Sequence, residues 1–313
     1  MVTPMFIGDA NQKATGISAA SFKGALRFWW RALVWASVRS TATTSSEALK
    51  KLHEQESQLF GSAAGDKTTC QSAVAVQILH APLKTIINWP PKSQSDSSAY
   101  LAYGLTGDNG AAHREAITED QLFTVELTFK PSVTAQQMNS VRDALTLLGM
   151  AGGLGGRARR ALGSVAMILL DQQEVTFDND SAWLSEITKL LDRYKTNELN
   201  ELPPFTAFSK FSSIQLIVSG RDAREAHLRI GSEYKEFRKN IPTKSRVPLG
   251  LPLTSIDTNK RRSSPLLLHI HPVGKGFTGV AVFLPAVFHP DIKAGNTSDY
   301  FTPVSGFGKE ARK

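Results

Sequence analysis

The order of elements in this sequence predicts an α+β fold of two ferredoxin-like (βαββαβ, RRM-like) domains. Three features support it. A helical apolar pattern begins near Ser21, apolar and polar residues alternate over residues 122–130, and a second helical pattern covers residues 135–150. With short strands around them, these give the order strand, helix, two strands, helix, strand, ending near Leu170. A chain of 313 residues is long enough for two domains of ordinary size.

The first predicted domain covers residues 1–171. It opens with a short apolar strand over residues 1–8 and a polar loop over residues 9–16. The next helix has Ser21 as its N-cap. Its apolar face repeats every three or four residues, at Phe22, Leu26, Trp29, Leu33 and Ala36. The remaining elements before residue 122 are a polar stretch (41–57) that is helical in its second half, a strand (71–80) and an insertion loop without periodicity (82–120).

The second half is predicted to be another α+β unit. Residues 172–203 form a linker and a helix that carries Trp183, Ile187, Leu190 and Leu191 and that Pro203-Pro204 ends. The C-terminal domain covers residues 204–313. Its predicted elements are a strand (205–218), a helix (221–239), a Pro-rich loop (241–252) and two strands (265–271 and 276–284).

A Gly/Arg-rich loop over residues 152–164 follows the second helix of the first domain. Glycines let the main chain approach a ligand and adopt positive φ, and arginines bind phosphate oxygens in bidentate fashion, so the loop is typical of a polyanion site. Gly153-x-Gly155-x-x-Ala158 has dinucleotide-binding spacing, but a helix precedes the loop and a strand is expected after it, the reverse of that fingerprint. A Walker phosphate loop is excluded because no Gly-Lys-Ser/Thr closes a Gly-rich stretch. The alternative is a solvated connector with surface arginines.

A second cationic feature lies on the first helix. Lys23, Arg27 and Arg31 follow at four-residue steps and form a stripe on a helix that is otherwise apolar. Such a stripe fits a ligand or partner surface, or long side chains that extend past the core to solvent. The chain as a whole has 36 Lys and Arg against 28 Asp and Glu, a net charge of +8, which favours an acidic partner without identifying it.

Cysteine usage and hydropathy indicate the compartment. The single cysteine, Cys70, excludes an internal disulfide and a Cys-rich metal site, so a reducing compartment, the cytoplasm, is expected. The N-terminal residues carry no charged region followed by a long apolar one, so no signal peptide is predicted. No stretch approaches the ~20 apolar residues of a membrane span, and no membrane association is expected.

Several motifs resemble a known family. Residues 3–8 (TPMFIG), residues 21–31 (SFKGALRFWWR), the Gly/Arg loop, residues 247–252 (VPLGLP) and residues 260–266 (KRRSSPL) are similar to the first-numbered subunits of the CRISPR type III-B Cmr effector complex, in the repeat-associated mysterious protein (RAMP) superfamily. The helix motif ending in Phe-Trp-Trp-Arg is the most specific, and the resemblance covers nearly the whole chain. Ala158 and Ala161 stand where Ser and Gly are frequent, which puts hydroxyl contacts from the loop in doubt.

The resemblance implies two ferredoxin-like domains and a place at the end of the complex that holds the 3′ part of the guide RNA. We therefore expect a non-catalytic RNA-binding subunit for antiviral defence, which contacts guide (crRNA) or target RNA and other RAMP subunits. No cofactor, metal or small-molecule substrate is expected. Phosphate contacts would make binding independent of base sequence. The residues expected to contact RNA are Lys23, Arg27, Arg31, Gly153, Gly155, Gly156, Arg157, Arg159, Arg160, Asn11, Gln12, Lys13, Arg261 and Arg262.

Two alternatives remain at this point. An endoribonuclease would need a metal cluster or an acid/base pair, and the candidates are Asp9 in the first loop and His269 and His271, which share one face of a strand. A lone aspartate in such a loop is more often a turn former, and the histidine pair lacks a third metal ligand. A purely structural adaptor would dock its basic stripe on an acidic neighbour instead.

Overall fold

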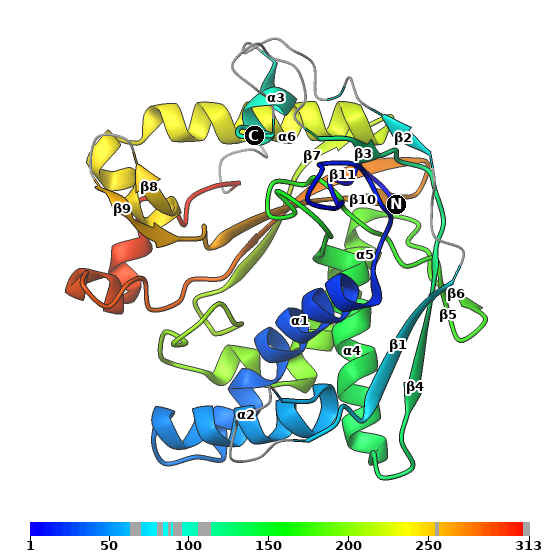
Figure 1. Cartoon of the computed structure of the whole chain (residues 1–313). Coiled ribbons are helices and arrows are strands. Elements are labelled where there is room, and N and C mark those ends of the chain that lie inside the picture. The colour runs from blue at the N-terminus through cyan, green and yellow to red at the C-terminus, as the bar shows by residue number, and fades with distance from the viewer. Residues whose placement is uncertain are drawn as a thin grey trace.

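The structure, a computed structural model, has a mixed α+β architecture (Figure 1). It describes residues 1–62, 70–79, 84–86, 89, 96–105, 114–253 and 257–308. The predicted α+β class is confirmed.

Helices dominate the N-terminal half. Helix α1 (Ala19–Ser40) starts earlier than predicted, because its N-cap is Ser18, whose side chain accepts a hydrogen bond from the backbone N–H of Ser21. Helix α1 packs against α2 (Ser45–Phe60) and α4 (Ala135–Ala151). The strands β1 (Val74–Leu79) and β4 (Thr124–Phe129) form an antiparallel two-stranded sheet. The helices predicted within residues 41–57 and 135–150 and the strands predicted within 71–80 and 122–130 are confirmed.

The predicted outer strands of the first domain are largely missing. The N-terminal segment forms only isolated bridges, Met5 with Ile117 and Phe6 with Gly156. The strand expected over residues 164–170 is reduced to β5 (Leu169–Leu170), which pairs with β6 (Gln173–Glu174). Among the described residues, no sheet has more than three strands, whereas a βαββαβ domain needs four. Two ferredoxin-like domains are therefore not confirmed.

The insertion loop expected over residues 82–120 contains ordered elements where it is described, so that prediction is wrong there. Strand β2 (Thr85–Ile86) pairs with β3 (Ala116–Ile117), and the short helix α3 (Ser97–Leu101) begins after its N-cap Asp96. Trp89 is buried. Elements of two to five residues are too short to produce a periodic pattern. Residues 82–83, 87–88, 90–95 and 106–113 lie outside the described part of the chain.

The C-terminal half is built on a three-stranded antiparallel sheet. Its strand order is β10 (Leu266–Val273), β11 (Gly276–Phe283) and β7 (Ser213–Gly220). The predicted strands over 265–271 and 276–284 are confirmed, and the strand expected over 205–218 is confirmed only from Ser213. The other elements are α5 (Asp180–Arg193), α6 (Ala223–Asn240), β8 (Leu251–Leu253), β9 (Asp257–Arg262) and the 3-10 turns Thr196–Glu198, Thr243–Leu249, Lys293–Asn296 and Ser298–Phe301.

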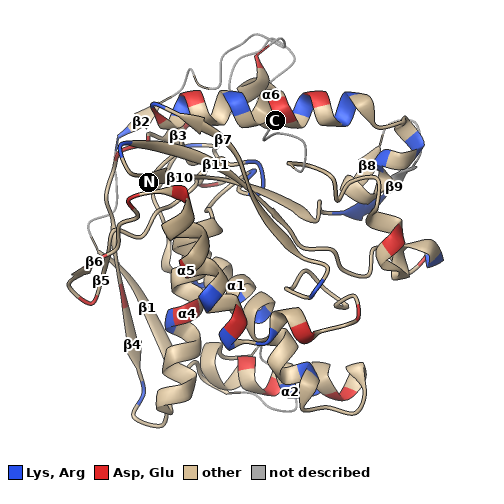
Figure 2. Ribbon diagram, turned by 180° about the vertical axis from the view of Figure 1, so that it is seen from behind, with Lys and Arg blue, Asp and Glu red and all other residues tan. Residues whose placement is uncertain are grey.

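Helices cover both faces of this sheet (Figure 1). Leu266, Leu268 and Ile270 of β10 belong to one apolar cluster with residues of α6. The alternating Leu267 packs into the other cluster, with residues of α1, α4 and α5. The core therefore continues from one half of the chain into the other. Figure 2 shows basic and acidic residues alternating along α6 and a basic stretch on β9. The domain boundaries at residues 171 and 204 stay a prediction.

Candidate nucleic-acid interface

The Gly/Arg loop is held against the rest of the fold by backbone hydrogen bonds. On one side, the N–H of Gly156 donates to the carbonyl of Phe6 (2.7 Å) and that of Gly163 to the carbonyl of Pro4 (2.8 Å). On the other side, Ala161 donates to the carbonyl of Leu268 (3.0 Å) on β10. The loop thus joins the N-terminal segment to the central sheet and presents its side chains from a fixed backbone.

The loop glycines are explained by close approach within the chain. A Cβ at Gly155, where φ is +84°, would lie 2.6 Å from the carbonyl oxygen of Phe6. One at Gly153 would lie 2.9 Å from the carbonyl oxygen of Gly163. The space that these glycines leave is filled by the chain's own backbone, which the sequence did not indicate. Direct contact of Gly153, Gly155 and Gly156 with RNA stays a prediction.

The three loop arginines have different surroundings. Arg157 is exposed and has a φ of +61°, a left-handed conformation. The guanidinium of Arg159 lies 5.2 Å from the ring centroid of Phe28 on α1 and donates to the carbonyl of Ser264 (2.6 Å). The guanidinium of Arg160 lies 4.5 Å from the ring centroid of Tyr234 on α6. One short segment therefore contributes cations to more than one place on the molecule.

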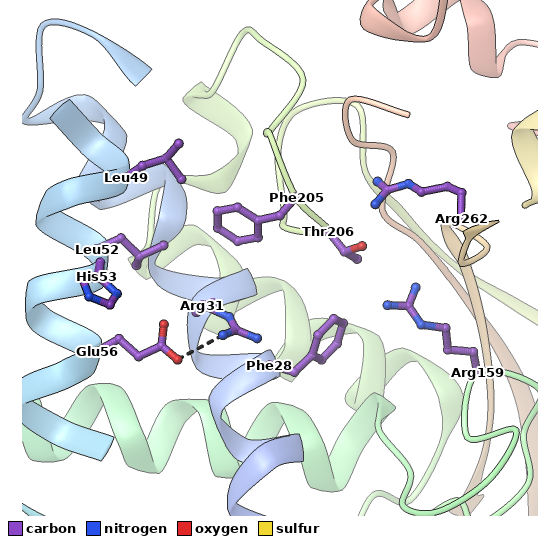
Figure 3. A pocket seen from close by; sticks show the side chains of 10 residues that line it. All are labelled: Phe28, Arg31, Leu49, Leu52, His53, Glu56, Arg159, Phe205, Thr206 and Arg262. Atoms are coloured by element: carbon purple, nitrogen blue, oxygen red, sulfur yellow. Dashed lines mark hydrogen bonds and ion pairs between the residues drawn. The ribbon is translucent and has the colours of Figure 1, made fainter. Parts of the chain in front are cut away.

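A hollow of about 420 Å³ brings together residues from three of the predicted basic segments. In Figure 3, the guanidinium groups of Arg159 and Arg262 both point into it from one side, and Arg31 of α1 lies across from them. The ring of Phe28 lies between Arg31 and Arg159, and the ring of Phe205 lies above Arg31 in this view. The full lining is Phe28, Arg31, Leu49, Leu52, His53, Glu56, Arg159, Phe205, Thr206 and Arg262.

The hollow carries excess positive charge from Arg159 and Arg262. Burial, together with the neighbouring charges of Arg262 and Arg160, lowers the pKa of Arg159 to about 10. Burial also lowers the pKa of Arg262. Arg159 remains charged at neutral pH, and neither arginine has a carboxylate within ion-pair distance among the described residues. Two partly desolvated cations side by side favour binding of a phosphate. An aromatic ring next to them can stack on the base of the same nucleotide.

The helix stripe is partly neutralised within the chain. The same carboxylate oxygen of Glu56 on α2 accepts hydrogen bonds from Arg27 (2.7 Å) and Arg31 (3.0 Å). The ammonium of Lys23 donates to Ser72 Oγ (2.6 Å) and the carbonyl of Val74 (3.2 Å), and burial, with a smaller effect of Arg27, lowers its pKa. These contacts link α1 to α2 and β1. Since two arginines share one carboxylate, the stripe retains excess positive charge, and its contact with RNA stays a prediction.

Replacing Glu56 with glutamine should separate structural from ligand-binding roles of this stripe. Glu56 is only 5% exposed, and loss of its charge leaves Arg27 and Arg31 unpaired. We expect the free energy of unfolding, measured with urea, to fall by about 2 kcal/mol. Glu54→Gln, at an exposed position of the same helix, should leave it unchanged. RNA affinity should stay equal or increase in Glu56→Gln, and a loss of affinity without loss of stability would contradict the ion pair's structural role.

The first loop is an exposed turn organised by Asp9. Its Oδ1 accepts hydrogen bonds from the backbone N–H groups of Asn11 (2.9 Å) and Lys13 (3.2 Å), the arrangement of a turn former. Gln12 has a φ of +65°. Asn11, Gln12 and Lys13 are exposed and do not line the hollow, so their contact with RNA stays a prediction, as does that of Arg261, exposed on β9.

The two strand histidines are buried in the core. As predicted, His269 and His271 share one face of β10, with Nε2 of His269 3.3 Å from Nδ1 of His271, and the ring of His271 packs against Trp183. Both are at most 2% exposed. Among the described residues, no group of three or more His, Cys, Asp or Glu side chains is arranged to hold a metal ion. The burial of both rings fits a packing role in the core rather than a role in binding a metal ion.

Acid should destabilise the fold through its buried histidines. Burial lowers the pKa of His227 to about 4 and of His269 to about 3, and that of His271 well below its ordinary value of 6.5. Below about pH 6.5 the unfolded chain therefore binds protons that the folded chain does not, and stability falls by about 1.4 kcal/mol per pH unit for each histidine. Urea unfolding between about pH 7.5 and pH 5 measures this slope. His269→Gln should reduce it by about one proton, and a flat profile would contradict the assignment.

Two aromatic lining residues were not expected as site residues. Phe28 lies within the Phe-Trp-Trp-Arg motif, so that motif was the available signal. Phe205 follows Pro203-Pro204 in a segment expected to be a strand, and nothing in its local sequence indicates that it lines the same hollow as Arg159 and Arg262.

Comparison with known proteins reveals relatives along the whole chain. Residues 1–166 match the model of the RAMP superfamily. The chain is 26% identical over 302 residues to the CRISPR system Cmr subunit Cmr1-1 of Pyrococcus furiosus, covering 91% of this chain and 85% of that protein. It is 28% identical over 184 residues to subunit Cmr1-2 of the same organism, covering 54% of this chain and 92% of that protein.

Solved structures share the fold. The crystal structure of apo Cmr1 from Pyrococcus furiosus superposes with a TM-score of 0.62 at 21% identity, covering 97% of this chain and 94% of that one. A second match is a chain in the cryo-EM structure of the Type III-B Cmr-beta complex, bound to cognate target RNA and AMPPnP in the presence of ssDNA. It gives a TM-score of 0.60 at 12% identity, covering 98% of this chain and 96% of that one. None of the described helices has the length and apolar character needed to cross a membrane.

Proposed function

This chain belongs to the RAMP superfamily, and we propose that it is a non-catalytic RNA-binding subunit of a type III-B CRISPR Cmr ribonucleoprotein. The Cmr subunits among its relatives support the assignment to that complex, and one structural relative belongs to a complex bound to target RNA. In this proposal the chain holds the 3′ region of the guide RNA, the paired target RNA, or both, next to other RAMP subunits in the cytoplasm.

The observation that carries the proposal is the convergence of Arg31, Arg159 and Arg262 on one hollow with two aromatic rings. These arginines come from α1, the Gly/Arg loop and β9, far apart in the sequence. Guanidinium groups bind phosphates without reading bases, and rings stack on bases of any identity. Such a site accepts RNA of any sequence, as a guide-binding subunit must.

The alternatives have less support. For an endoribonuclease, Asp9 accepts hydrogen bonds that order its own turn. His269 and His271 are at most 2% exposed, so their rings do not reach a substrate. In a purely structural adaptor, Arg159 and Arg262 would bind an acidic side chain of a neighbouring subunit. An acidic side chain would not use the aromatic rings that line the same hollow, whereas a nucleotide would. We also propose, as the family resemblance implies, that the chain is divided into two ferredoxin-like domains.

Photocrosslinking tests the proposal directly. We expect a reconstituted complex carrying 4-thiouridine in its guide or target RNA to crosslink to this chain at peptides that contain Phe28, Arg159 or Phe205. Crosslinks from guide-labelled and target-labelled complexes would separate the two strands. Crosslinks of the labelled RNA to neighbouring subunits, with none to this chain, would establish the adaptor instead. RNA cleavage by the purified chain that is lost in Asp9→Ala or His271→Ala would establish the nuclease.

A further inference from the structure

A second group of cations surrounds Tyr234, and none of its members lines the hollow. The guanidinium of Arg160 lies 4.5 Å from the ring centroid of Tyr234 and that of Arg238 lies 5.7 Å from it. Arg238 also donates a hydrogen bond from Nη1 to the hydroxyl of Tyr234 (3.3 Å). One buried phenol ring is thus in contact with two guanidinium groups, one from the Gly/Arg loop and one from α6.

These two arginines have no carboxylate partner in the described part of the chain, unlike the arginines in the first half of α6. Arg224 pairs with Glu119, and Arg229 with Glu225 (2.9 Å). Nη1 of Arg160 is buried and has no hydrogen-bond acceptor. A buried donor without an acceptor destabilises the free protein, and two guanidinium groups next to one ring repel each other. An anion bound there would offset both costs.

An exposed aromatic residue extends this group to the surface. Tyr100 on α3 lies 6.2 Å from Tyr234 between ring centroids, and Tyr103, just beyond the end of α3, is 79% exposed. The guanidinium of Arg157 lies against Gly104, next to Tyr103. A large exposed ring beside an exposed guanidinium is the combination that binds one nucleotide, with the base on the ring and the phosphate on the cation.

We propose that Arg157, Arg160 and Arg238, with Tyr103, form a second RNA subsite that binds the sugar-phosphate backbone of a single-stranded segment and stacks one base on Tyr103. The inference rests on the proposed function in taking RNA as the ligand. Arg159 and Arg160 are consecutive, so the loop joins this subsite to the hollow, and one strand can occupy both. An acidic peptide of a neighbouring subunit would use the arginines but would leave Tyr103 without a role, so RNA is favoured.

Equilibrium binding of the full chain to a fluorescent oligouridylate of about 18 nucleotides tests the subsite. We expect Arg238→Gln and Tyr103→Ala each to raise Kd by about three- to tenfold, and Arg238→Gln to reduce the salt dependence of log K by about 0.7, the value for one lost phosphate contact on a single strand. Tyr103→Phe should retain the affinity because the ring remains. Arg229→Gln removes the same charge from the same helix at an ion-paired position and should have no effect.

The outcomes distinguish this subsite from the hollow. If Arg238→Gln and Tyr103→Ala bind RNA like the unmodified chain while Arg262→Gln does not, the second subsite is wrong and the proposed function stands. If Arg262→Gln is without effect while the other two variants bind weakly, the hollow is not an RNA site and the second subsite stands. Unchanged RNA affinity together with failure of Arg238→Gln to assemble with the other subunits would show a protein partner and overturn the inference.

Discussion

The double variant Arg159→Gln, Arg262→Gln should bind single-stranded RNA at least tenfold more weakly than the unmodified chain. Both guanidinium groups point into the hollow, and neither has a carboxylate among the described residues to take up its charge (Figure 3). Each phosphate contact on a single strand contributes about 0.7 to the salt dependence of log K, so the slope should fall by about 1.4. Fluorescence anisotropy with an unstructured RNA of about 20 nucleotides, at several salt concentrations, measures both quantities.

The control for this variant must remove the same charge elsewhere. Lys189 and Lys195 are exposed and lie 3.9 Å and 3.8 Å from the carboxylates of Glu186 and Glu198, so Lys189→Gln with Lys195→Gln lowers the net charge equally without touching the hollow. If this control weakens binding as much, attraction by net charge explains the affinity and the hollow is not a site. Because Arg159 also donates to the carbonyl of Ser264, urea unfolding should be measured on both double variants, and glutamine is chosen since it can still donate there.

The sequence predicted those parts of the fold whose patterns are long. Helix α1 and the strand β4 carry regular apolar spacing over several turns or alternations. Both occur where expected, except that the N-cap of α1 is Ser18 rather than Ser21. The prediction of the outer strands was wrong for a physical reason. The segment around Met5 and Phe6 is apolar because it is buried, yet its backbone bonds to separate partners, Ile117 and Gly156, rather than to one strand. An apolar run indicates burial, and its pairing depends on distant residues.

The candidate site was predictable by residue type but not by arrangement. The sequence identifies the Gly/Arg loop and the pair Arg261 and Arg262 as cationic segments. That the two segments lie side by side in the fold depends on contacts such as that of Arg159 with Ser264, 105 positions away in the sequence. Local sequence also could not show that Glu56, on the next helix, accepts hydrogen bonds from both Arg27 and Arg31. Charge periodicity therefore located a face of α1, while the tertiary structure decided how much of its charge remains for a ligand.

Gly163→Ala should be among the most destabilising single substitutions in the Gly/Arg loop. Gly163 has a φ of +63°, and an added Cβ would lie 2.1 Å from the carbonyl oxygen of Leu154, so the backbone itself must move. That movement would break the hydrogen bonds from Gly163 N–H to Pro4 and from Leu154 N–H to Gly163. We expect the free energy of unfolding to fall by about 2–4 kcal/mol.

Two glycines make this expectation specific. Gly24 on α1 has open space at its Cβ position, and Gly24→Ala should stabilise by up to about 1 kcal/mol through helix propensity. Gly156→Ala, in the same loop, meets nothing nearer than 3.4 Å and should be nearly neutral. If urea unfolding gives Gly163→Ala the same stability as Gly156→Ala, the loop can relax around a methyl group, and its arginines are not held by a fixed backbone. A large difference would mean that the glycines serve the architecture of the loop, leaving anion binding to the side chains of Arg157, Arg159 and Arg160.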